Sequence, residues 1–318
     1  MNRKSLFVMI AATLVVLLFG GCGGIAIDGV SVSEKNTSEF SSVDVTTSCS
    51  RIEFISSDRY GFDIFVPGSF APVWDITDGR LTIRENTGIS IFRLGIFSPS
   101  YYVKVYCPSG SVFDEITLTS ASGRINLPKT DVAKLDIRSA SGRVDAYAEN
   151  FTNASIVTAS GSITFSGSGG NASLDSSSGT VRSVINDCES MKITTNSGSV
   201  NLTGKGESDT ALTVNTASGR IQIDGTAWRD ATTSTSSGKT EISGELLGNT
   251  SVETASGSVN ISVHGSPSQY GYSLTPVSGS VHWDGNKMAK PAFSSGSFDN
   301  HITVNTASGG IRVSFTKR

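Results

Sequence analysis

A Ser-Gly dipeptide recurs along this chain at nearly constant spacing, as in TASGRIQI around Gly219 and TASGSVNI around Gly257. Successive glycines of this series lie 18 to 22 residues apart, and the last step is 30 residues. The glycines are Gly123, Gly142, Gly161, Gly179, Gly198, Gly219, Gly238, Gly257, Gly279 and Gly309. Self-similarity at a fixed period indicates a repeat architecture whose units bury their apolar surface against neighbouring units.

Each repeat carries the alternation of two short strands. Around Gly219, apolar residues fall seven and five positions before the glycine (Leu212 and Val214) and two and four positions after it (Ile221 and Ile223). A period of two indicates strands with one buried face. Because the parity changes across Ser-Gly, the chain must turn or bulge there. Glycine allows a positive φ or a close backbone approach, and the serine beside it can bond neighbouring backbone groups.

Stacking of equivalent repeats would place like residues on like residues, with strands about 4.8 Å apart. The segments between repeats are short and rich in Gly, Asn and Ser, which argues against helical crossovers. Nineteen residues are too few for a propeller blade, which takes about 40. The sequence therefore predicts an all-β fold, a single-stranded, β-helix-like β-solenoid of about ten 19-residue coils with an N-terminal β cap.

The region before the first clear repeat is predicted to cap the stack. Val43–Phe54 fits the repeat template with Ser50 in the glycine position, so we expect a degenerate coil there. Three further strand-like stretches follow, at Gly61–Val66, Arg80–Arg84 and Tyr101–Cys107. The aromatic-rich segment Ile89–Tyr106 is expected to pack over the open first coil, with a ligand-binding aromatic surface as the alternative.

At the other end, the 30-residue step between Gly279 and Gly309 is too long for a regular coil. It contains Asp284–Pro291 and His301, which we expect in an excursion from the stack.

The N-terminus has the pattern of a targeting segment. Residues 2–4 are Asn-Arg-Lys, and Leu6–Phe19 is apolar except for Thr13, which suits a signal peptide and is short for a membrane span. Gly20-Gly21-Cys22 resembles the lipobox of bacterial lipoproteins, although Phe19 stands where leucine is usual. This resemblance implies cleavage before Cys22 and attachment of diacylglycerol to its sulfur. An uncleaved membrane anchor is the alternative and would leave the domain on the same side of the membrane.

These observations predict four segments. They are a lipoprotein signal peptide (1–21), a lipidated tether (22–40), an N-terminal β cap with a degenerate repeat (41–115) and the β-solenoid repeats (116–318).

Three cysteines remain after Cys22, namely Cys49, Cys107 and Cys188. A Cys49–Cys107 disulfide is one interpretation, because both lie before the repeats, and small buried hydrophobic side chains are the other. No CxxC or Cys/His cluster is present, so we expect no metal site and no cofactor.

Composition excludes one class of partner. Charged residues make up 17% of the chain, against about 25% in an average soluble domain, and the net charge is -3. Lysine and arginine are scattered, so we expect no nucleic-acid partner.

Catalysis finds little support in the outward positions. Three residues after each glycine, the repeats carry in chain order Asn126, Asp145, Thr164, Arg182, Asn201, Gln222, Glu241, Asn260, His282 and Arg312. No two acids are adjacent in this column, and Asp175 and Glu253, four residues before their glycines, are four coils apart. The three histidines, His264, His282 and His301, belong to no nucleophile motif. We therefore predict no enzymatic activity, and a polysaccharide-active β-helix enzyme is the less favoured alternative.

The recurring TASGxIxI pattern, preceded by RLTIRE and YYVKVYCPSG, resembles the putative-adhesin β-strand-repeat family of bacteria, a domain of unknown function. The resemblance covers residues 40–315. It implies a cell-surface or envelope protein, lipid-anchored in some members, with a solenoid of stacked strands. It brings no catalytic or metal-binding residues.

The outward columns suggest an interaction role. Hydroxyls dominate them, and Arg124, Arg143, Arg220 and Lys239 directly follow their glycines. We predict an extracytoplasmic protein, lipid-anchored to the bacterial cell membrane, that serves as an adhesion or interaction module. Its expected partners are the membrane, through the anchor, and a cell-wall or surface glycan or another envelope protein. An accessory protein of envelope-stress sensing is the alternative. The Ser-Gly itself is interpreted as a structural corner.

Overall fold

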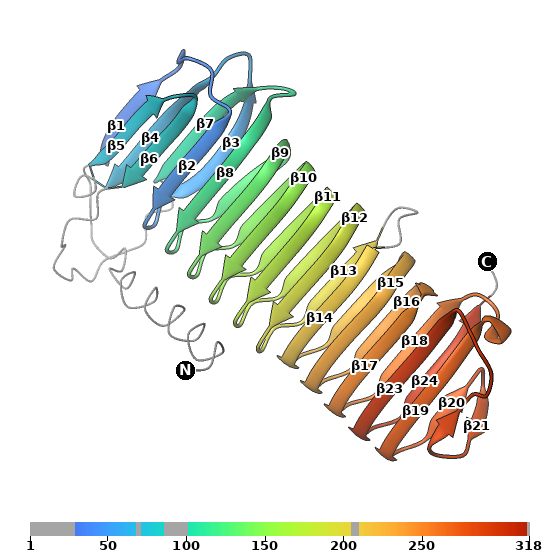
Figure 1. The fold of residues 1–318 in the computed structure, drawn as a ribbon. Coiled ribbons are helices and arrows are strands. Elements are labelled where there is room, and N and C mark those ends of the chain that lie inside the picture. The colour runs from blue at the N-terminus through green and yellow to red at the C-terminus, as the bar shows by residue number, and fades with distance from the viewer. Residues whose placement is uncertain (1–28, 68–70, 86–100, 205–209, 317–318) are drawn as a thin grey trace, which may run out of the picture. The chain divides into compact units, whose positions relative to one another are not determined.

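The computed structural model describes residues 29–67, 71–85, 101–204 and 210–316 (Figure 1). These residues form 24 β-strands and one 3-10 turn, η1 (Pro267–Gln269). The chain divides into two compact units, with the boundary between Gly161 and Ser162. The expected all-β, solenoid-like class is confirmed, because most neighbouring strands within each unit pair in parallel.

The first unit contains β1 (Gly29–Glu34), β2 (Ser42–Thr47), β3 (Arg51–Ser57), β4 (Gly61–Pro67), β5 (Pro72–Thr77), β6 (Arg80–Glu85), β7 (Tyr102–Pro108), β8 (Val112–Ser120), β9 (Ile125–Ser139) and β10 (Val144–Thr158). The second contains β11 (Ile163–Ser176), β12 (Val181–Thr195), β13 (Val200–Gly204), β14 (Thr210–Ser218), β15 (Ile221–Ser237), β16 (Thr240–Leu247), β17 (Asn249–Ser256), β18 (Val259–His264), β19 (Tyr270–Ser278), β20 (Val281–Trp283), β21 (Asn286–Met288), β22 (Ala292–Phe293), β23 (Asn300–Ser308) and β24 (Ile311–Thr316). No helix among the described residues is long and apolar enough to cross a membrane.

In five coils a single strand of 14 to 17 residues runs from one Ser-Gly corner to the next, namely β9, β10, β11, β12 and β15, so the two short strands expected for each repeat are continuous there. Equivalent residues stack in register, and β9 and β10 place Val144 beside Ile125 and Ile156 beside Ile137. In the second unit, the inward column two positions after each glycine is buried to 1% exposure or less. This column consists of Ile163, Val181, Val200, Ile221, Thr240, Val259, Ile311 and Val281. Burial of each aliphatic side chain stabilises the coil by about 1.5–3 kcal/mol. The alternation expected on both sides of the glycine is therefore confirmed.

The corner glycines are required mainly by close approach. A Cβ on Gly142 would lie 2.0 Å from the carbonyl oxygen of Gly123 in the adjacent coil, and a Cβ on Gly198 would lie 1.9 Å from that of Gly179. No side chain fits at such distances. Positive φ is an additional requirement only toward the C-terminus, as at Gly238 (φ 150°) and Gly279 (φ 126°).

Two hydrogen-bond arrangements occur at these corners. In the first, the glycine N–H donates to a hydroxyl three residues earlier, as from Gly198 to Thr195 Oγ1 at 3.0 Å. In the second, it donates to a serine carbonyl of the adjacent coil, as from Gly257 to Ser308 at 2.9 Å. At three corners of this second kind, the hydroxyl three residues before the glycine is buried without a hydrogen-bond partner among the described residues, namely that of Thr235, Thr254 and Thr306. At Gly219 the corresponding hydroxyl, that of Thr216, donates to the carbonyl oxygen of Gly198 at 3.4 Å.

The two arrangements predict opposite effects of the same substitution. Thr195→Val removes the acceptor of a buried N–H and is expected to lower the free energy of unfolding by about 1–3 kcal/mol. Thr254→Val replaces a buried hydroxyl that lacks a partner and is expected to be neutral or stabilising. Urea unfolding of both variants provides the measurement, and an equal loss in the two would contradict the two arrangements.

The interior of the second unit accommodates one large ring. Trp228 in β15 is 1% exposed, and its Nε1 donates to the carbonyl oxygen of Ser243 at 3.3 Å. Glycines of three coils make room for it, because a Cβ would lie 2.8 Å from the ring at Gly204, 2.5 Å at Gly225 and 3.2 Å at Gly244. The sequence reasoning did not detect this tryptophan, although the three glycines share the position six residues after their corner glycines.

At the N-terminal end, the order of the strands in space differs from their order in the chain. Strand β2 lies between β6 and β8, and β3 lies between β7 and β9. Ser50 occupies the glycine position, and its carbonyl oxygen lies 2.0 Å from where a Cβ on Gly123 would be. Strands β2 and β3 lie on either side of Ser50, and the three strand-like stretches are β4, β6 and β7. Residues 86–100 of the expected aromatic cap lie outside the described residues, and its C-terminal part belongs to β7.

At the C-terminal end, the last repeat of the chain is inserted into the stack. Strand β23 pairs with β17 on one side and β19 on the other, and β24 lies between β18 and β20. The outward residues were expected in chain order, with His282 next to Asn260. This order is wrong here, because Arg312 is the neighbour of Asn260 and His282 lies beyond it. His301 lies within the stack, in β23, and not in the excursion. The 30-residue step lets the chain leave β20 and return between two coils already formed.

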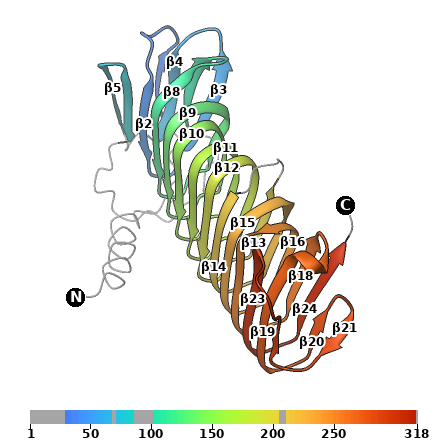
Figure 2. The same ribbon diagram turned by 45° about the vertical axis from the view of Figure 1, so that its right-hand side comes forward.

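Antiparallel strands line the ends of both units. In the first unit, β1 pairs with β4 and β5 pairs with β6. In the second unit, β21 pairs with β20 and β22 pairs with β19. Figure 2 shows β5 and β21 at the margins of their own units. Short antiparallel additions of this kind limit edge-to-edge pairing with other molecules. β1 falls within the segment expected to be a tether, and β21 lies in the expected excursion, Asp284–Pro291.

The Cys49–Cys107 disulfide is not formed. Cys107 carries a free thiol, as does Cys188. Burial raises the pKa of Cys107, and it raises the pKa of Cys188 to about 11. The other interpretation of the cysteines was that they are small buried hydrophobic side chains. Cys188 fits this interpretation, because it is 3% exposed.

Candidate functional site

The cations that follow the corner glycines are engaged in ion pairs. In the first unit, Asp145 accepts from both Arg124 and Arg143, with Oδ2 2.9 Å from Arg124 Nε and Oδ1 2.8 Å from Arg143 Nε. In the second unit, Glu241 is paired in the same way with Arg220 and Lys239. Each acid lies three residues after one corner glycine and bridges the cations of two adjacent coils. The four basic residues noted after the corner glycines are thus partly neutralised, and each cluster of two cations and one acid keeps one net positive charge.

The pKa values of both bridging acids lie below their ordinary values. Burial raises the pKa of Asp145, but hydrogen bonds from Arg143 and Arg124 outweigh it and hold the pKa below its ordinary value. A hydrogen bond from Lys239 is the largest cause of the lowered pKa of Glu241. The side chains of Arg124 and Arg220 are about half exposed to solvent, so their ion pairs add little to the free energy of unfolding. Their main effect is to fix the positions of the charged side chains on the outer face.

A shallow groove of about 530 Å³ runs along the Ser-Gly corners of the second unit. We call it the corner groove. It crosses four coils, whose order in space places residues 305–307 between residues 253–255 and 275–277. Val277 is 81% exposed beside it. The lining residues are Ser234, Thr235, Ser236, Glu253, Thr254, Ala255, Thr275, Val277, Asn305, Thr306 and Ala307. Small, mostly uncharged side chains thus line an open path along the stack.

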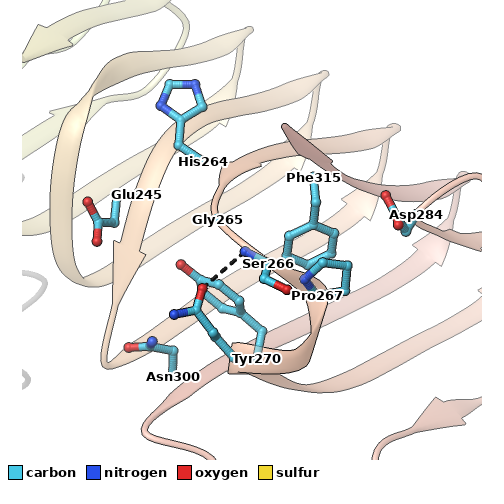
Figure 3. A pocket seen from close by; sticks show the side chains of 10 residues that line it. Glu245, His264, Gly265, Ser266, Pro267, Tyr270, Asp284, Asn300 and Phe315 are labelled. Atoms are coloured by element: carbon cyan, nitrogen blue, oxygen red, sulfur yellow. Dashed lines mark hydrogen bonds between the residues drawn. The ribbon is translucent and has the colours of Figure 1, made fainter. Parts of the chain in front are cut away.

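A second cavity, of about 500 Å³, lies on the C-terminal coils of the same unit (Figure 3). We call it the C-terminal pocket. Its lining residues are Glu245, His264, Gly265, Ser266, Pro267, Gln269, Tyr270, Asp284, Asn300 and Phe315. They come from β16, β18, η1, β19, β23 and β24 and from the turn between β20 and β21. The inserted last repeat supplies Asn300 and Phe315, so the pocket depends on the changed stacking order.

Local contacts fix the shape of this pocket. Ser266 precedes η1 and makes two hydrogen bonds with Gln269. The Ser266 N–H donates to Gln269 Oε1 at 3.0 Å, and the Gln269 backbone N–H donates to the Ser266 carbonyl oxygen at 3.0 Å. The rings of Tyr270 and Phe315 lie 5.6 Å apart, and Trp283 packs against the edge of Phe315 at 4.9 Å. Tyr270 is 4% exposed, while Phe315 is half-buried. In Figure 3 the dashed line at Ser266 marks the hydrogen bond from its N–H, and Tyr270 and Phe315 are labelled nearby.

The structure separates most of the titratable residues considered from the sequence. Asp175 lies beside Thr194, and Glu253 lies between Ser234 and Asn305, so the two acids are far apart in the column. Burial raises the pKa of Asp175 despite the charge of Lys192. Of the histidines, only His264 lines the C-terminal pocket.

Sequence reasoning missed the combination of Glu245, Asp284 and Phe315 in one pocket. These residues belong to different repeats, and no feature of the repeat pattern indicates the insertion that brings them together. Cys22, the expected lipidation site, lies outside the described residues. At corner glycines such as Gly142 and Gly198, a Cβ would meet the backbone of the adjacent coil.

Comparison with known proteins identifies related sequences and folds. Residues 75–314 match the Toastrack DUF4097 family. No curated protein matches the chain significantly. Among solved structures, one described as a putative lipid binding protein from Parabacteroides distasonis ATCC 8503 is 13% identical, with a TM-score of 0.51, covering 90% of this chain and 97% of its own. One described as a putative adhesin from the same organism is 12% identical, with a TM-score of 0.41, covering 93% and 98%. One described as a putative adhesin from Bacteroides fragilis NCTC 9343 is 14% identical, with a TM-score of 0.34, covering 91% and 100%.

Proposed function

Because the chain belongs to the Toastrack DUF4097 family, as its repeats suggested, we propose that it is an interaction module of the bacterial cell envelope. Its partner would be a cell-wall or surface glycan or another envelope protein, and it would act by binding and not by catalysis. The finer architecture expected from the repeats, about ten coils of 19 residues behind an N-terminal β cap, is part of this proposal.

The observation that carries the proposal is the corner groove. It is open along its length, crosses four coils and repeats similar small side chains at the spacing of the strands. A surface of this kind suits an extended polymer that makes many weak contacts, each coil contributing hydroxyls, small apolar groups or a single acid. The ion pairs of Glu241 with Arg220 and Lys239 support the same role. They join two adjacent coils on the outer face and so help to keep the exposed side chains of these coils in register.

The test is retention of the full chain by isolated envelope fractions and on a glycan array. Ala307→Arg places a long charged side chain in the groove and is expected to reduce retention at least tenfold. Ser177→Arg is the matched control, because Ser177 holds the same position, two residues before its corner glycine, but lies outside the groove. Failure of the unchanged chain to be retained by any fraction or glycan would contradict the proposal.

We propose further that Cys22 carries the membrane anchor. The basic start, the apolar run and the small residues before Cys22 support cleavage and lipidation. Two acyl chains hold a protein on a membrane stably, whereas one gives only marginal binding.

Cys22→Ser is therefore expected to move the protein from the membrane fraction to the soluble fraction, or to block its maturation. Fractionation combined with metabolic labelling by palmitate provides the measurement. Mass spectrometry of the N-terminal peptide after reduction distinguishes a lipid thioether from a thiol. A variant that stays in the membrane, together with an unchanged chain that takes up no label, would rule out the anchor.

A further inference from the structure

Three basic side chains lie in one row across the last strands of the second unit. Strands β24, β20 and β21 are neighbours (Figure 2), and their register places Arg312 beside His282 and His282 beside Lys287. Register partners on adjacent strands project from the same face of a sheet, and the strands lie about 4.8 Å apart. Ile311 and Val313 on either side of Arg312 are buried, so this face is the outer one. We call the three residues the basic row.

The basic row has no acid within it. Arg312 and Lys287 are exposed, His282 is half-buried, and none of the three has an ion pair or a side-chain hydrogen bond within the described part of the chain. In the two clusters of cations described above, an acid three residues after a corner glycine neutralises part of the charge. Here that position is held by Arg312 and His282, and the next residue in the row, Asn260, is neutral.

Positive charge also exceeds negative charge on the strands around the row. Lys290 Nζ donates to the carbonyl oxygen of Gly279, the corner that precedes β20, at 3.1 Å. Asp284, on the turn between β20 and β21, is exposed and forms no ion pair with another described residue. Residues 279–291 and 309–316 thus carry three cations, Arg312, Lys287 and Lys290, and this one acid, although the whole chain has a net charge of -3.

The donors of the row indicate the chemistry of a ligand. Arginine and lysine only donate hydrogen bonds, and a histidine ring carries at least one N–H. Long side chains that reach over His282 from both sides suit an anion whose acceptor oxygens point in several directions. A phosphate monoester has three such oxygens and a charge of about -1.5 to -2 at pH 7, and it is a preferred partner of arginine. A carboxylate has two oxygens in one plane and a single charge.

The surroundings of the row favour a soluble ligand over a membrane surface. The outward positions two residues from Arg312 and His282 hold Ser280, Asp284, Gly310 and Ser314. None of these is an apolar side chain that inserts into the hydrocarbon boundary of a bilayer, and Asp284 would be repelled by anionic lipid headgroups.

We propose that the basic row binds a phosphate monoester group carried by a saccharide of the envelope, with Arg312 and Lys287 donating to its oxygens from the two sides of His282. The inserted last repeat creates this site, because it places Arg312 between Asn260 and His282. The site lies outside the corner groove and does not require the groove to be occupied, so the inference goes beyond the function proposed above.

The experiment measures binding of the detergent-solubilised full chain to one oligosaccharide in three forms, which carry a terminal phosphate monoester, a uronic acid or no charge. We expect binding of the phosphorylated form, at least fivefold weaker binding of the uronic-acid form and no measurable binding of the neutral form. Salt screens exposed charges, so the affinity for the phosphorylated form should fall about threefold or more between about 0.05 and 0.2 M ionic strength.

Substitutions locate the binding. Arg312→Gln is expected to reduce the affinity for the phosphorylated form at least tenfold, and Lys287→Gln about threefold. Both side chains are exposed and unpaired, so neither variant should change the urea midpoint. Arg182→Gln is the matched control. Arg182 is also exposed and lies three residues after its corner glycine, but its neighbours in the column, Thr164 and Asn201, are neutral, so its loss should leave the affinity unchanged.

Four results would overturn the proposal. The first is equal binding of the phosphorylated and uronic-acid forms. The second is an equal loss of affinity in Arg182→Gln and Arg312→Gln, which would indicate a general effect of surface charge. The third is binding to phosphatidylglycerol vesicles without binding to the phosphorylated oligosaccharide, which would indicate a membrane surface. The fourth is absence of binding to the phosphorylated form, whether or not envelope fractions retain the protein through the corner groove.

Discussion

Gly219→Val is expected to lower the free energy of unfolding by about 3 kcal/mol or more. The Cβ of the new side chain would lie 2.2 Å from the carbonyl oxygen of Gly198 and 2.9 Å from its carbonyl carbon. Both are backbone atoms of the adjacent coil, so neither can move aside as a flexible side chain would. The corner must open, which breaks its hydrogen bond from the Gly219 N–H to the Ser237 carbonyl (3.0 Å).

Ser199→Val is the control for this prediction. Ser199 is a half-buried residue that follows the corner glycine of the adjacent coil, so it receives the same valine close to the same corner. We expect it to change the free energy of unfolding by less than about 1 kcal/mol. Urea unfolding followed by fluorescence, with Trp228 as a buried probe in the same unit, gives both values. Equal midpoints for the two variants would show that the corners do not require glycine.

Trp228→Ala is expected to cost about 3–5 kcal/mol, the range for loss of a large buried aromatic side chain. The loss should lie toward the upper end, because the walls of the resulting cavity are glycines. Gly204, Gly225 and Gly244 carry no side chains that could move into the space left by the ring. The buried hydrogen bond from the indole to Ser243 is lost as well.

A double-mutant cycle separates this packing from a general effect of losing a tryptophan. Gly225→Ala alone should be destabilising, because its Cβ would lie 2.5 Å from the indole ring. In the Trp228→Ala background, the same change should cost less or become favourable, since the added methyl group partly fills the cavity. We expect a coupling of about 0.5–3 kcal/mol from differential unfolding, and strict additivity would show that the glycines do not accommodate the ring.

The repeat pattern predicted the coil because each coil obeys local rules. Strand alternation decides which residues point inward, so Ile221 and Ile223 could be assigned to the core from the sequence alone. The glycine corners could be located for the same reason. Whether a given glycine served positive φ or close approach could not be decided, because that depends on the distance to the next coil. Gly219 is required by close approach, while Gly238 is required by both.

The order of the coils could not be predicted from the repeats. All repeats present similar edges, so residues 300–316 fit between two earlier coils as well as they would fit at the end of the stack. The 30-residue step signals that the chain leaves the stack, but it does not show where the chain returns. The C-terminal pocket was missed for this reason, since Asn300 and Phe315 reach Tyr270 only through the insertion.

The ion pairs were missed for a simpler reason. Arg124 and Arg143 were considered as a column of their own, and the acid between them, Asp145, was considered in another column. Neighbouring outward columns on one strand lie two residues apart, within reach of an arginine side chain. Reading both columns together would have indicated the clusters.

The last repeat of the chain lies between two earlier coils and so completes both candidate surfaces. Engineered cysteine pairs on the outer face test it directly. Glu253 and Asn305 are register partners on adjacent strands, and Asn305 and Thr275 are partners on the next pair. Adjacent parallel strands lie about 4.8 Å apart, which suits a disulfide, whereas strands two steps apart, about 9.6 Å, cannot be bridged.

The measurement is disulfide formation under mild oxidation, followed by peptide mapping, in two double variants. The chain with Glu253→Cys and Asn305→Cys is expected to form the cross-link efficiently, and the chain with Glu253→Cys and Thr275→Cys is expected to stay reduced at these positions. The reverse result, a cross-link between positions 253 and 275 and none between 253 and 305, would mean that the coils stack in chain order and would contradict the account.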